Sequence, residues 1–573
     1  MASLQRVRVR GYTYWRIVES RRVNGKPRLF VVAHLGKADG LLERLKAADA
    51  LRIRSRSHGA VAAVYALARE LDIAGTIDRH LAASGRRDRD QPVHVPDPQR
   101  VAKPHDGLST GRSLELACTG RACHATSKMG FADWSGTTTL GELASVNVDK
   151  LTSQHFWDQM DQVPVELLSS IEREIVGRAI ERFGLSTDAL LYDATNFFTF
   201  IASTNIRCEI PARGRGKQKR HDLRQVGVAL VCSRGEGIPL FHQVYGGQVP
   251  DARSFADVLP KIRQRLVELG RDLEAVTIVY DKGNVSKDNQ GAVGRFKLHY
   301  VASLTASSQR ALVNEANAKL EPVKLSEDES IQAFRTRRTI WDEDRTVVML
   351  VSERLRDGQL RGVEQHLTSA SQWLDDLAAI LLRGRQKRDR AQIERDIQKR
   401  LMGRQFLGKV IRVHLTGEGR SLRLGYEVDR VAMEALSRDW LGRQVLITDR
   451  HDWSTAEIIR AYRGQSDVEA AFEHIKDPVH VMLRPQYHWT DQKLHVHVFT
   501  CVMAYLLGRL LFLKAQRALG YDRSMERLLD TLAKVRQVRV ARFAGKKGLR
   551  VTTQFEDMDD ETAKLARGLG VVR

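Results

Sequence analysis

Apolar and polar positions alternate in different ways along the chain, and each pattern predicts its own kind of element. Residues 12–35 form two β-rich runs around Asn24-Gly25, a dipeptide typical of a tight hairpin turn. From 58 to 82 apolar residues recur at helical spacing with Gly75 as a break, which predicts two short helices. Such a pair is compatible with a DNA-reading helix-turn-helix and also with a packed helical hairpin.

The middle of the chain changes to strand patterns after a helix that is expected to end at Gly184. The predicted strands cover 189–198, 224–233, 237–245, 275–281 and 299–306, with a helix at about 254–269 between the third and the fourth. This order predicts an α/β core built on a mixed sheet. A charged helical stretch is expected at about 371–405, and one continuous helix from about Ser454 to Lys476.

Breaks in these patterns divide the chain into eight predicted segments. They are an N-terminal β unit (1–50), a helix pair (51–83), a linker or loop (84–110), a helical region (111–185), the first part of the α/β core (186–309), a β-rich insertion domain (310–450), the last part of the core (451–516) and a basic, mainly helical C-terminal region (517–573).

The net charge of the chain indicates what kind of partner it binds. The 573 residues include 92 Lys and Arg against 70 Asp and Glu, a formal net charge of +22 that favours a polyanionic partner such as nucleic acid. A hydrophobic content of 42% with 13 prolines is that of a globular protein, so the charge is expected on folded surfaces.

Cysteine use and apolar windows bear on location. Five cysteines in so long a chain suit a reducing cytoplasm better than a disulfide scaffold. The N-terminus lacks the apolar stretch of a signal peptide. The most apolar window, 498–508, is broken by Arg509, and it is short of the roughly 20 residues that span a bilayer. We therefore expect a core helix, no membrane partner and a cytoplasmic protein.

Three acids are candidates for metal chemistry. Asp193 and Asp281 each follow a predicted apolar strand, and the edge where strands end is where α/β sheets bind ligands. One such acid alone is usually a turn or cap residue, but two in a basic protein suggest a divalent-metal site that needs a third carboxylate. Glu469, in the helix that opens with a capping box at Ser454, is the candidate.

Glu469 belongs to a polar set on one face of that helix. The set is Tyr462, Gln465, Glu469 and Lys476, with separations of 3, 4 and 7 residues. Taken alone, this set is also typical of a solvated helix face. Rivals for the third acid are Asp449, Glu457 and Glu473.

Three sequence blocks carry a family resemblance. YDATN at 192–196, VYDKGN at 279–284 and YRGQSDVEAAFEHIK at 462–476 resemble the signature blocks of DDE transposases of bacterial insertion sequences. The subgroup is the one named for its Tyr-Arg-Glu-Lys helix, the insertion-sequence-four superfamily, in its sixteen-thirty-four-like branch. Segments 220–240 and 127–134 also resemble that branch, so the resemblance covers most of the chain.

The resemblance implies an RNase H-like core in which Asp193, Asp281 and Glu469 hold two Mg²⁺ or Mn²⁺ ions per active site. It implies binding of terminal inverted repeats, metal-dependent cleavage, a hairpin intermediate, strand transfer into target DNA, and a homodimer or larger synaptic assembly. Tyr462 and Lys476 would position backbone phosphates. Gln465 stands where the family has Arg, so a fixed charge for a phosphate contact is missing.

The resemblance also implies an aromatic side chain that holds a flipped base; Trp440 and Trp453 are the candidates, and either is also compatible with a core residue. A basic loop between the first two core strands is either a DNA path or a plain solvated loop; its members are Arg213, Arg215, Lys217, Lys219, Arg220 and Arg224. A second basic patch comprises Lys534, Arg536, Arg539, Arg542, Lys546, Lys547 and Arg550.

Sequence signals for a zinc site or a nucleotide-binding loop are weak or absent. Cys118, Cys123 and His124 lack a partner pair at zinc spacing, and the histidines near 488–497 are more typical of a core or an interface. No Walker-type phosphate loop occurs. Two alternatives to a transposase stay open: an inactive, transposase-derived DNA-binding protein, and a DNA nuclease without strand transfer.

Overall fold

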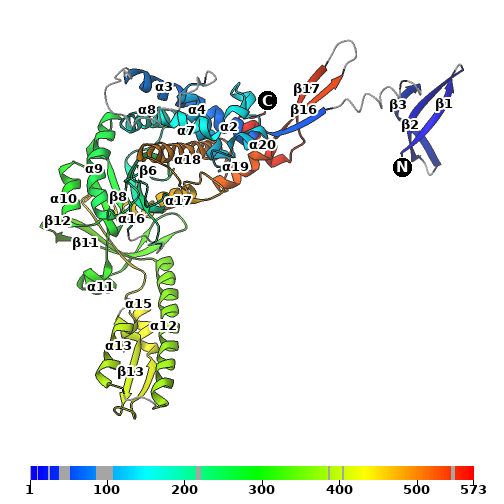
Figure 1. The fold of residues 1–573 in the computed structure, drawn as a ribbon. Coiled ribbons are helices and arrows are strands. Elements are labelled where there is room, and N and C mark those ends of the chain that lie inside the picture. The colour runs from blue at the N-terminus through cyan, green and yellow to red at the C-terminus, as the bar shows by residue number, and fades with distance from the viewer. Residues whose placement is uncertain are drawn as a thin grey trace. The chain divides into compact units, whose positions relative to one another are not determined.

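A computed structural model describes most of the chain, in two compact units (Figure 1). The described residues are 2–9, 11–23, 26–37, 40, 52–84, 108–214, 220, 222–384, 388–402, 406–484, 486–543 and 549–572. The first unit comprises Met1–Val163, Pro478–Met482 and Met503–Arg573, and the second comprises Pro164–Asp477 and Leu483–Val502. Most of the predicted linker 84–110 and the predicted turn Asn24-Gly25 lie outside the described residues.

The first unit begins with a three-stranded antiparallel sheet in the order β1-β2-β3. Its strands are β1 (Ala2–Val9), β2 (Tyr12–Val23) and β3 (Lys26–Lys37). The two runs predicted from the sequence are β2 and β3. β1 was not predicted, although its alternation of apolar and basic residues is a strand pattern.

The expected helix pair is α2 (Gly59–Glu70) and α3 (Ile73–Ala83), but the break between them is not at Gly75. The chain turns at Asp72, which has a left-handed φ of 50°. Gly75 lies inside α3, where a Cβ atom would come within 2.3 Å of the Asp72 carboxylate. Gly75 therefore makes room for the turn and does not itself form it.

A second three-stranded sheet in this unit pairs a strand from the N-terminal part of the chain with two strands from the C-terminal part. β4 (Arg52–Ser57) pairs with β16 (Arg536–Phe543), which pairs with β17 (Leu549–Phe555). The C-terminal region is therefore partly β-structure. Helices complete the unit: α4 (Thr110–Cys123), α5 (Phe131–Gly136), α6 (Leu140–Leu143), α7 (Ser153–Asp161), α19 (Met525–Ala533) and α20 (Asp560–Gly568).

The second unit contains a nine-stranded mixed sheet, and five consecutive strands form its first part. These are β5 (Ala189–Phe198), β6 (Gln225–Ser233), β7 (Pro239–Gly246), β8 (Thr277–Tyr280) and β9 (His299–Leu304). They lie side by side in the order β7-β6-β5-β8-β9, with the first three antiparallel and β8 and β9 parallel to β5. The predicted mixed α/β sheet is confirmed.

Helices connect and cover these strands. α9 (Asp251–Glu268) links β7 to β8, and α10 (Lys287–Arg295) links β8 to β9. α8 (Val165–Phe183) precedes β5 and ends at Gly184, whose φ of 56° is the left-handed conformation that glycine adopts readily at a helix end. That helix end agrees with the sequence pattern.

Residues 310–450 differ from the single β-rich domain expected. After α11 (Arg310–Asn317), the strands β10 (Glu321–Lys324), β11 (Ser330–Ile340), β12 (Glu343–Val351) and β15 (Arg443–Thr448) extend the core sheet in the order β10-β11-β12-β15-β9. The reason is burial: residues 347–350 of β12 form an unbroken buried apolar run, the pattern of a strand covered on both faces.

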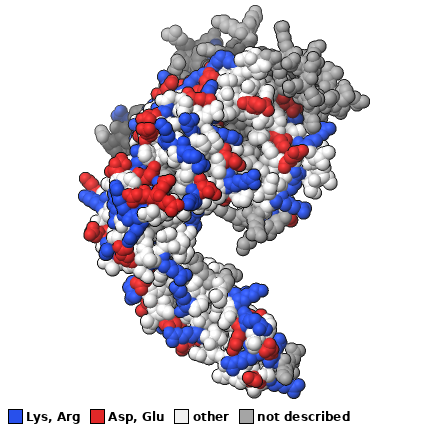
Figure 2. All heavy atoms as spheres, turned by 90° about the vertical axis from the view of Figure 1, so that its left-hand side faces the viewer, with Lys and Arg blue, Asp and Glu red and all other residues white. Residues whose placement is uncertain are grey.

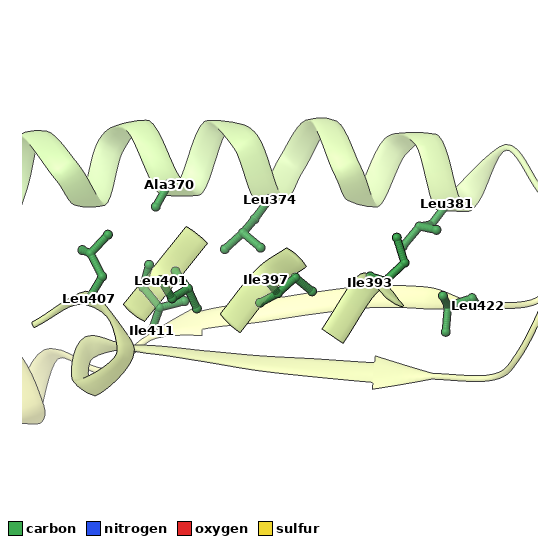
Figure 3. Close-up of a cluster of buried hydrophobic side chains, with 9 residues drawn as sticks. All are labelled: Ala370, Leu374, Leu381, Ile393, Ile397, Leu401, Leu407, Ile411 and Leu422. Carbon is green, nitrogen blue, oxygen red and sulfur yellow. The ribbon is translucent and has the colours of Figure 1, made fainter. Parts of the chain in front are cut away.

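The middle of that segment is mainly helical and has its own core. It comprises α12 (Glu353–Leu382), α13 (Arg390–Met402), α14 (Leu407–Val410), β13 (Ile411–Thr416), β14 (Arg423–Val428) and α15 (Arg430–Asp439). Figure 3 shows apolar side chains of α12, such as Leu374, pointing toward Ile393 and Ile397 of α13 and toward the β13–β14 hairpin. The predicted charged helix at 371–405 is thus the end of α12 followed by α13.

The expected helix from Ser454 to Lys476 is divided in two. α16 (Thr455–Arg463) opens with the predicted capping box at Ser454, and α17 (Gln465–Lys476) follows after Gly464. Further on, α18 (Asp491–Leu519) contains the apolar window noted in the sequence. Among the described helices it alone is long and apolar enough to cross a membrane, and 94% of its most apolar window is buried inside the protein.

Candidate active site

Asp193 and Asp281 lie on neighbouring parallel strands. β5 and β8 pair with Tyr192 opposite Tyr280, and each aspartate is the next residue along its chain. Adjacent strands are about 4.8 Å apart, so the two acids lie at the same level of the sheet. β8 ends there, whereas β5 continues to Phe198 against β6. Asp193 is therefore inside a strand, not at the strand end that the sequence predicted.

α16 and α17 cover the face of β5 that carries Asp193. Leu191 lies against Gly464, the Thr195 hydroxyl accepts a hydrogen bond of 2.9 Å from Lys476 Nζ, and the Phe197 ring lies 6.4 Å from that of Phe472. Side chains alternate along a strand, so Asp193 shares this face with all three strand residues. The helix that carries Glu469 is thereby packed along the strand that carries Asp193.

Gln465 and Lys476 attach the two ends of α17 to β5. The Gln465 amide donates a hydrogen bond of 2.7 Å to the backbone carbonyl of Tyr192, and its side chain is buried. Gln465 therefore binds protein backbone here and does not offer its amide to DNA. Glu469 lies one helical turn further along and is exposed.

Asp281 has a specific partner on α16. The Tyr462 hydroxyl donates a hydrogen bond of 2.9 Å to an Asp281 carboxylate oxygen. Burial of Tyr462, together with the negative charge of Asp281, raises the pKa of the phenol, so it stays a neutral donor. Asp281 is also the N-cap residue of the short helical turn Lys282–Asn284, but its side chain makes no capping hydrogen bond there.

The donor types suit a hard divalent cation, but the carboxylates are not gathered. Asp193, Asp281 and Glu469 offer only oxygen, the ligand atom that Mg²⁺ and Mn²⁺ prefer. Within the described residues, no three His, Cys, Asp or Glu side chains lie close enough together to hold a metal ion. The structure brings the backbones of the three acids to one region, with Asp281 bonded to Tyr462 and Glu469 turned to solvent.

Two of the three rival acids have other roles. Asp449 binds the His299 ring at 2.9 Å and the Tyr300 backbone N–H at 3.0 Å, and so holds the end of β15 to β9. Glu457 completes the capping box of α16 with Ser454. Glu473 is exposed on α17, one turn beyond Glu469.

A cavity of about 520 Å³ lies beside Thr195 and Lys476. Its lining includes three basic side chains, those of Arg213, Arg220 and Lys476, together with Phe198, neutral polar side chains and the acidic Asp251 at the start of α9. Arg224, in contrast, donates to backbone carbonyls of its own loop, including those of Ala202 and Asn205, so it holds the loop together. Arg215, Lys217 and Lys219 lie outside the described residues.

Neither tryptophan expected to hold a flipped base lies at this cavity. Trp440 packs against a small core that includes Leu436, and Trp453 lies next to Arg450 near β11. The cavity instead leads to a row of aromatic rings: Phe198 in its wall, Phe200 at 5.7 Å from Phe198, and Tyr487 stacked on Phe200 at 5.4 Å.

This row was missed because its members come from two distant segments, 198–200 and 487. Phe200 is 44% exposed and Tyr487 is 64% exposed, which is unusual for large rings. The Arg484 guanidinium lies 4.4 Å from the centre of the Phe198 ring. The available sequence signal was the alternation of aromatic and basic or polar residues in TNFFTF and RPQYHW.

Positive charge is spread over the surface. On the face shown in Figure 2, basic and acidic side chains are intermixed. The charged helix α13 follows this pattern, since Arg390 pairs with Glu394 at 2.9 Å. His495 and His497 lie in α18, where burial and the nearby His242 lower the pKa of His495 to about 4.

One segment of the chain matches a family model. Residues 4–59, from within β1 to just after β4, match the model of the IS1634 family transposase N-terminal domain. No curated protein sequence matches the chain.

Among solved structures, a piggyBac transposase synaptic complex with hairpin DNA aligns over 82% of this chain and 79% of its own, at 9% identity and a TM-score of 0.37. A Mos1 transposase paired-end complex with the left transposon end aligns over 36% of this chain and 61% of its own, at 11% identity and a TM-score of 0.15. Scores this low carry no argument about function. The N-terminal match supports an insertion-sequence transposase.

Proposed function

We propose that the protein is a DDE-type transposase that binds the terminal inverted repeats of an insertion sequence and cuts and rejoins DNA with divalent metal ions. The observation that carries the proposal is the position of Asp193 and Asp281, each directly after the Tyr192–Tyr280 pair of the adjacent parallel strands β5 and β8, with the Glu469 helix packed along the same face of β5. Three antiparallel strands followed by two parallel ones, in the order β7-β6-β5-β8-β9, support an RNase H-like core.

Asp193, Asp281 and Glu469 are the residues that would hold two Mg²⁺ or Mn²⁺ ions. When bound, such a metal pair activates the attacking oxygen and stabilises the leaving oxygen of a phosphodiester. The chain's own groups prepare the site. Tyr462 orients Asp281, and Gln465 with Lys476 holds α17, the helix that carries Glu469, against β5.

DNA is proposed to run past the cavity beside Lys476. Arg213, Arg220 and Lys476 supply cationic groups for backbone phosphates, and phosphate neutralisation provides most sequence-independent affinity. The exposed rings of Phe200 and Tyr487 offer stacking surfaces for a base that has left the duplex, as the hairpin route requires. The working form is a synaptic homodimer or larger assembly of a cytoplasmic protein.

Cleavage of a labelled duplex carrying the inverted repeat tests the proposal. The parent protein should cut at the repeat boundary with Mg²⁺ and not with EDTA, and Glu469→Gln should not cut. Glu473→Gln is the matched control, because it removes an exposed carboxylate one turn away on the same helix. Equal loss in both variants, or full activity of Glu469→Gln, would refute the assignment of Glu469.

The same assay separates the two alternatives. Binding without cutting by the parent identifies an inactive DNA-binding derivative, for which Gln465→Arg is the next protein to make. Cutting without joining, even when the 3′-hydroxyl is free, identifies a nuclease. A transposase joins the end when the 3′-hydroxyl is free and loses joining when it is blocked.

A further inference from the structure

A row of arginines lies on the sheet that unites the two ends of the chain. In the β4–β16 pairing, Arg54 lies directly opposite Arg539. Arg56 is two residues from Arg54 and so shares its face of the sheet. We call Arg54, Arg56 and Arg539 the arginine ladder. Arg54 and Arg539 are both exposed.

This arrangement of arginines lowers the stability of the folded protein, so folding by itself does not explain it. Like charges directly opposite each other on adjacent strands repel. One carboxylate relieves part of the repulsion, because Glu142 contacts both Arg56 and Arg539 at 2.7 Å. No acidic side chain among the described residues pairs with Arg54. Three guanidinium groups against one carboxylate leave the arginine ladder with a net charge of +2.

The β16–β17 pair also has arginines opposite each other in its register. The β16–β17 register places Arg542 opposite Arg550, a second pair of like charges in the backbone pairing. The sequence that joins these strands contains Lys546 and Lys547, and Lys534 is exposed just before β16. Arg536, in contrast, is used within the sheet, since it bonds to Ser55 and lies 3.5 Å from Glu556.

We propose that the β4–β16–β17 sheet binds duplex DNA, with the arginine ladder on backbone phosphates and the β16–β17 ribbon in a major groove. This proposal rests on the proposed function for its partner and assigns a surface that the candidate active site does not include. A two-stranded antiparallel ribbon fits the major groove of B-DNA. The seven residue pairs from Gln537–Phe555 to Phe543–Leu549 span roughly 24 Å, about the length of seven base pairs.

Two features favour duplex DNA over other nucleic acids. Single-strand binding uses exposed aromatic rings as stacking platforms, and the described side chains of this sheet include no exposed aromatic ring. Double-stranded RNA has a major groove too narrow for a ribbon to enter. The alternation of basic residues along paired strands matches a polyanion with regularly spaced charges.

Salt dependence of binding is the test. Anisotropy of a labelled 30-base-pair duplex is measured with full-length protein in EDTA, which prevents cleavage, over a series of salt concentrations. Each phosphate contact contributes about 0.9 to the slope of log K against log salt. Arg54→Gln and Arg539→Gln should each lower the slope by about 0.9, and the double variant by about 1.8. Arg361→Gln, at an exposed position of α12, is the control and should leave the slope unchanged.

A second variant separates binding from folding. Thr553 is exposed and lies opposite Arg539 on the same face, so Thr553→Asp places a carboxylate beside the ladder. This change should weaken duplex binding while the melting temperature is kept or raised, because a repulsive face becomes partly neutral. A purely structural ladder would show the opposite pattern, with Arg54→Gln altering stability and leaving binding unchanged.

The outcomes distinguish this proposal from the proposed function. If the double variant binds with the parent's slope, or if the parent binds no duplex, the ribbon assignment is refuted. If the ladder variants show a smaller slope of log K against log salt but the parent never cuts the repeat with Mg²⁺, the ribbon assignment stands and the catalytic proposal fails. Stronger binding of the matching single strand or RNA duplex than of the DNA duplex would also refute the ribbon assignment.

Discussion

Glu172 forms a buried ionic network that braces the sheet behind the candidate active site, and it provides the sharpest stability prediction. Its carboxylate lies 2.5 Å from the His242 ring and accepts a hydrogen bond of 3.0 Å from Arg265. The side chains of Glu172, His242 and Arg265 are 1%, 7% and 4% exposed. The network joins α8, β7 and α9.

Glu172→Gln keeps the shape of this side chain and removes its charge. Arg265 is then left as a buried cation with no counter-charge, although it still donates to the Leu240 and Ser169 carbonyls. Breaking a buried ion pair from one side costs about 3–5 kcal/mol. With a urea m-value of about 3 kcal/mol/M for a unit of this size, the midpoint should fall by about 1–1.7 M.

A matched control uses an exposed pair in the same unit. Arg173 and Glu268 lie 3.1 Å apart with side chains about one-third exposed, so Glu268→Gln should cost less than about 1 kcal/mol. Urea unfolding followed by far-UV circular dichroism measures both variants, with the transition of the second unit analysed separately because two units need not unfold together. A shift of less than about 0.3 M for Glu172→Gln would refute the reasoning.

Acid should weaken the same network. Burial alone would raise the pKa of Glu172, but His242 and Arg265 outweigh it and the pKa is lowered. A group whose pKa is lowered by folding contributes stability above its unfolded-state pKa, near 4.3, and loses it as the pH falls through the lowered value. The gap between parent and Glu172→Gln should therefore be constant near neutral pH and close in acid below about pH 4.

Three further changes test the site. Gly464→Ala places a Cβ atom within 3.2 Å of three neighbouring atoms, so it should lower the free energy of unfolding by about 1–2 kcal/mol and reduce cleavage. The control is Gly358→Ala, where the Cβ atom meets open space on α12. In the same urea assay this variant should raise the free energy of unfolding by up to about 1 kcal/mol. Tyr462→Phe removes the hydroxyl that orients the Asp281 carboxylate, so calorimetric titration should show Mn²⁺ binding several-fold more weakly; tighter binding would mean that the hydroxyl competes with the metal for Asp281. Tyr487→Leu should reduce the quenching of a 2-aminopurine base at the DNA end, and Tyr487→Phe, which keeps the ring, should not; equal quenching in both would exclude stacking there.

Local pattern predicted the elements of the α/β core well. The strands β5 to β9 are short apolar runs with turn residues between them, and such runs are stable only in a buried sheet. The helix end at Gly184 and the capping box at Ser454 also follow from local chemistry. The prediction failed where tertiary packing overrides a local signal, as at Gly75, which makes room for the Asp72 side chain inside a helix.

The sequence analysis did not predict strands where basic residues alternate with other residues, and it noted only the positive charge of such a segment. β4 and β16 carry an arginine at every second or third position, and neither strand has the apolar face that marks a buried strand. Each is stabilised by a partner about 480 residues away in the chain. The error over 310–450 has a related cause, because the sequence shows that β12 and β15 are strands but not which sheet they join.

The sequence by itself therefore determined the periodicities, the helix end at Gly184, the helix start at Ser454 and the three acid-bearing blocks, since each depends on residues within one or two turns of one another. Only the tertiary structure decided that Asp193 and Asp281 follow paired residues of adjacent strands, that Gln465 anchors the Glu469 helix to the Tyr192 carbonyl, and that Phe200 stacks on Tyr487. These contacts join residues 88 to 287 positions apart. Bringing them together depends on strand order and loop closure, which are properties of the whole fold and leave no periodic signal in the local sequence.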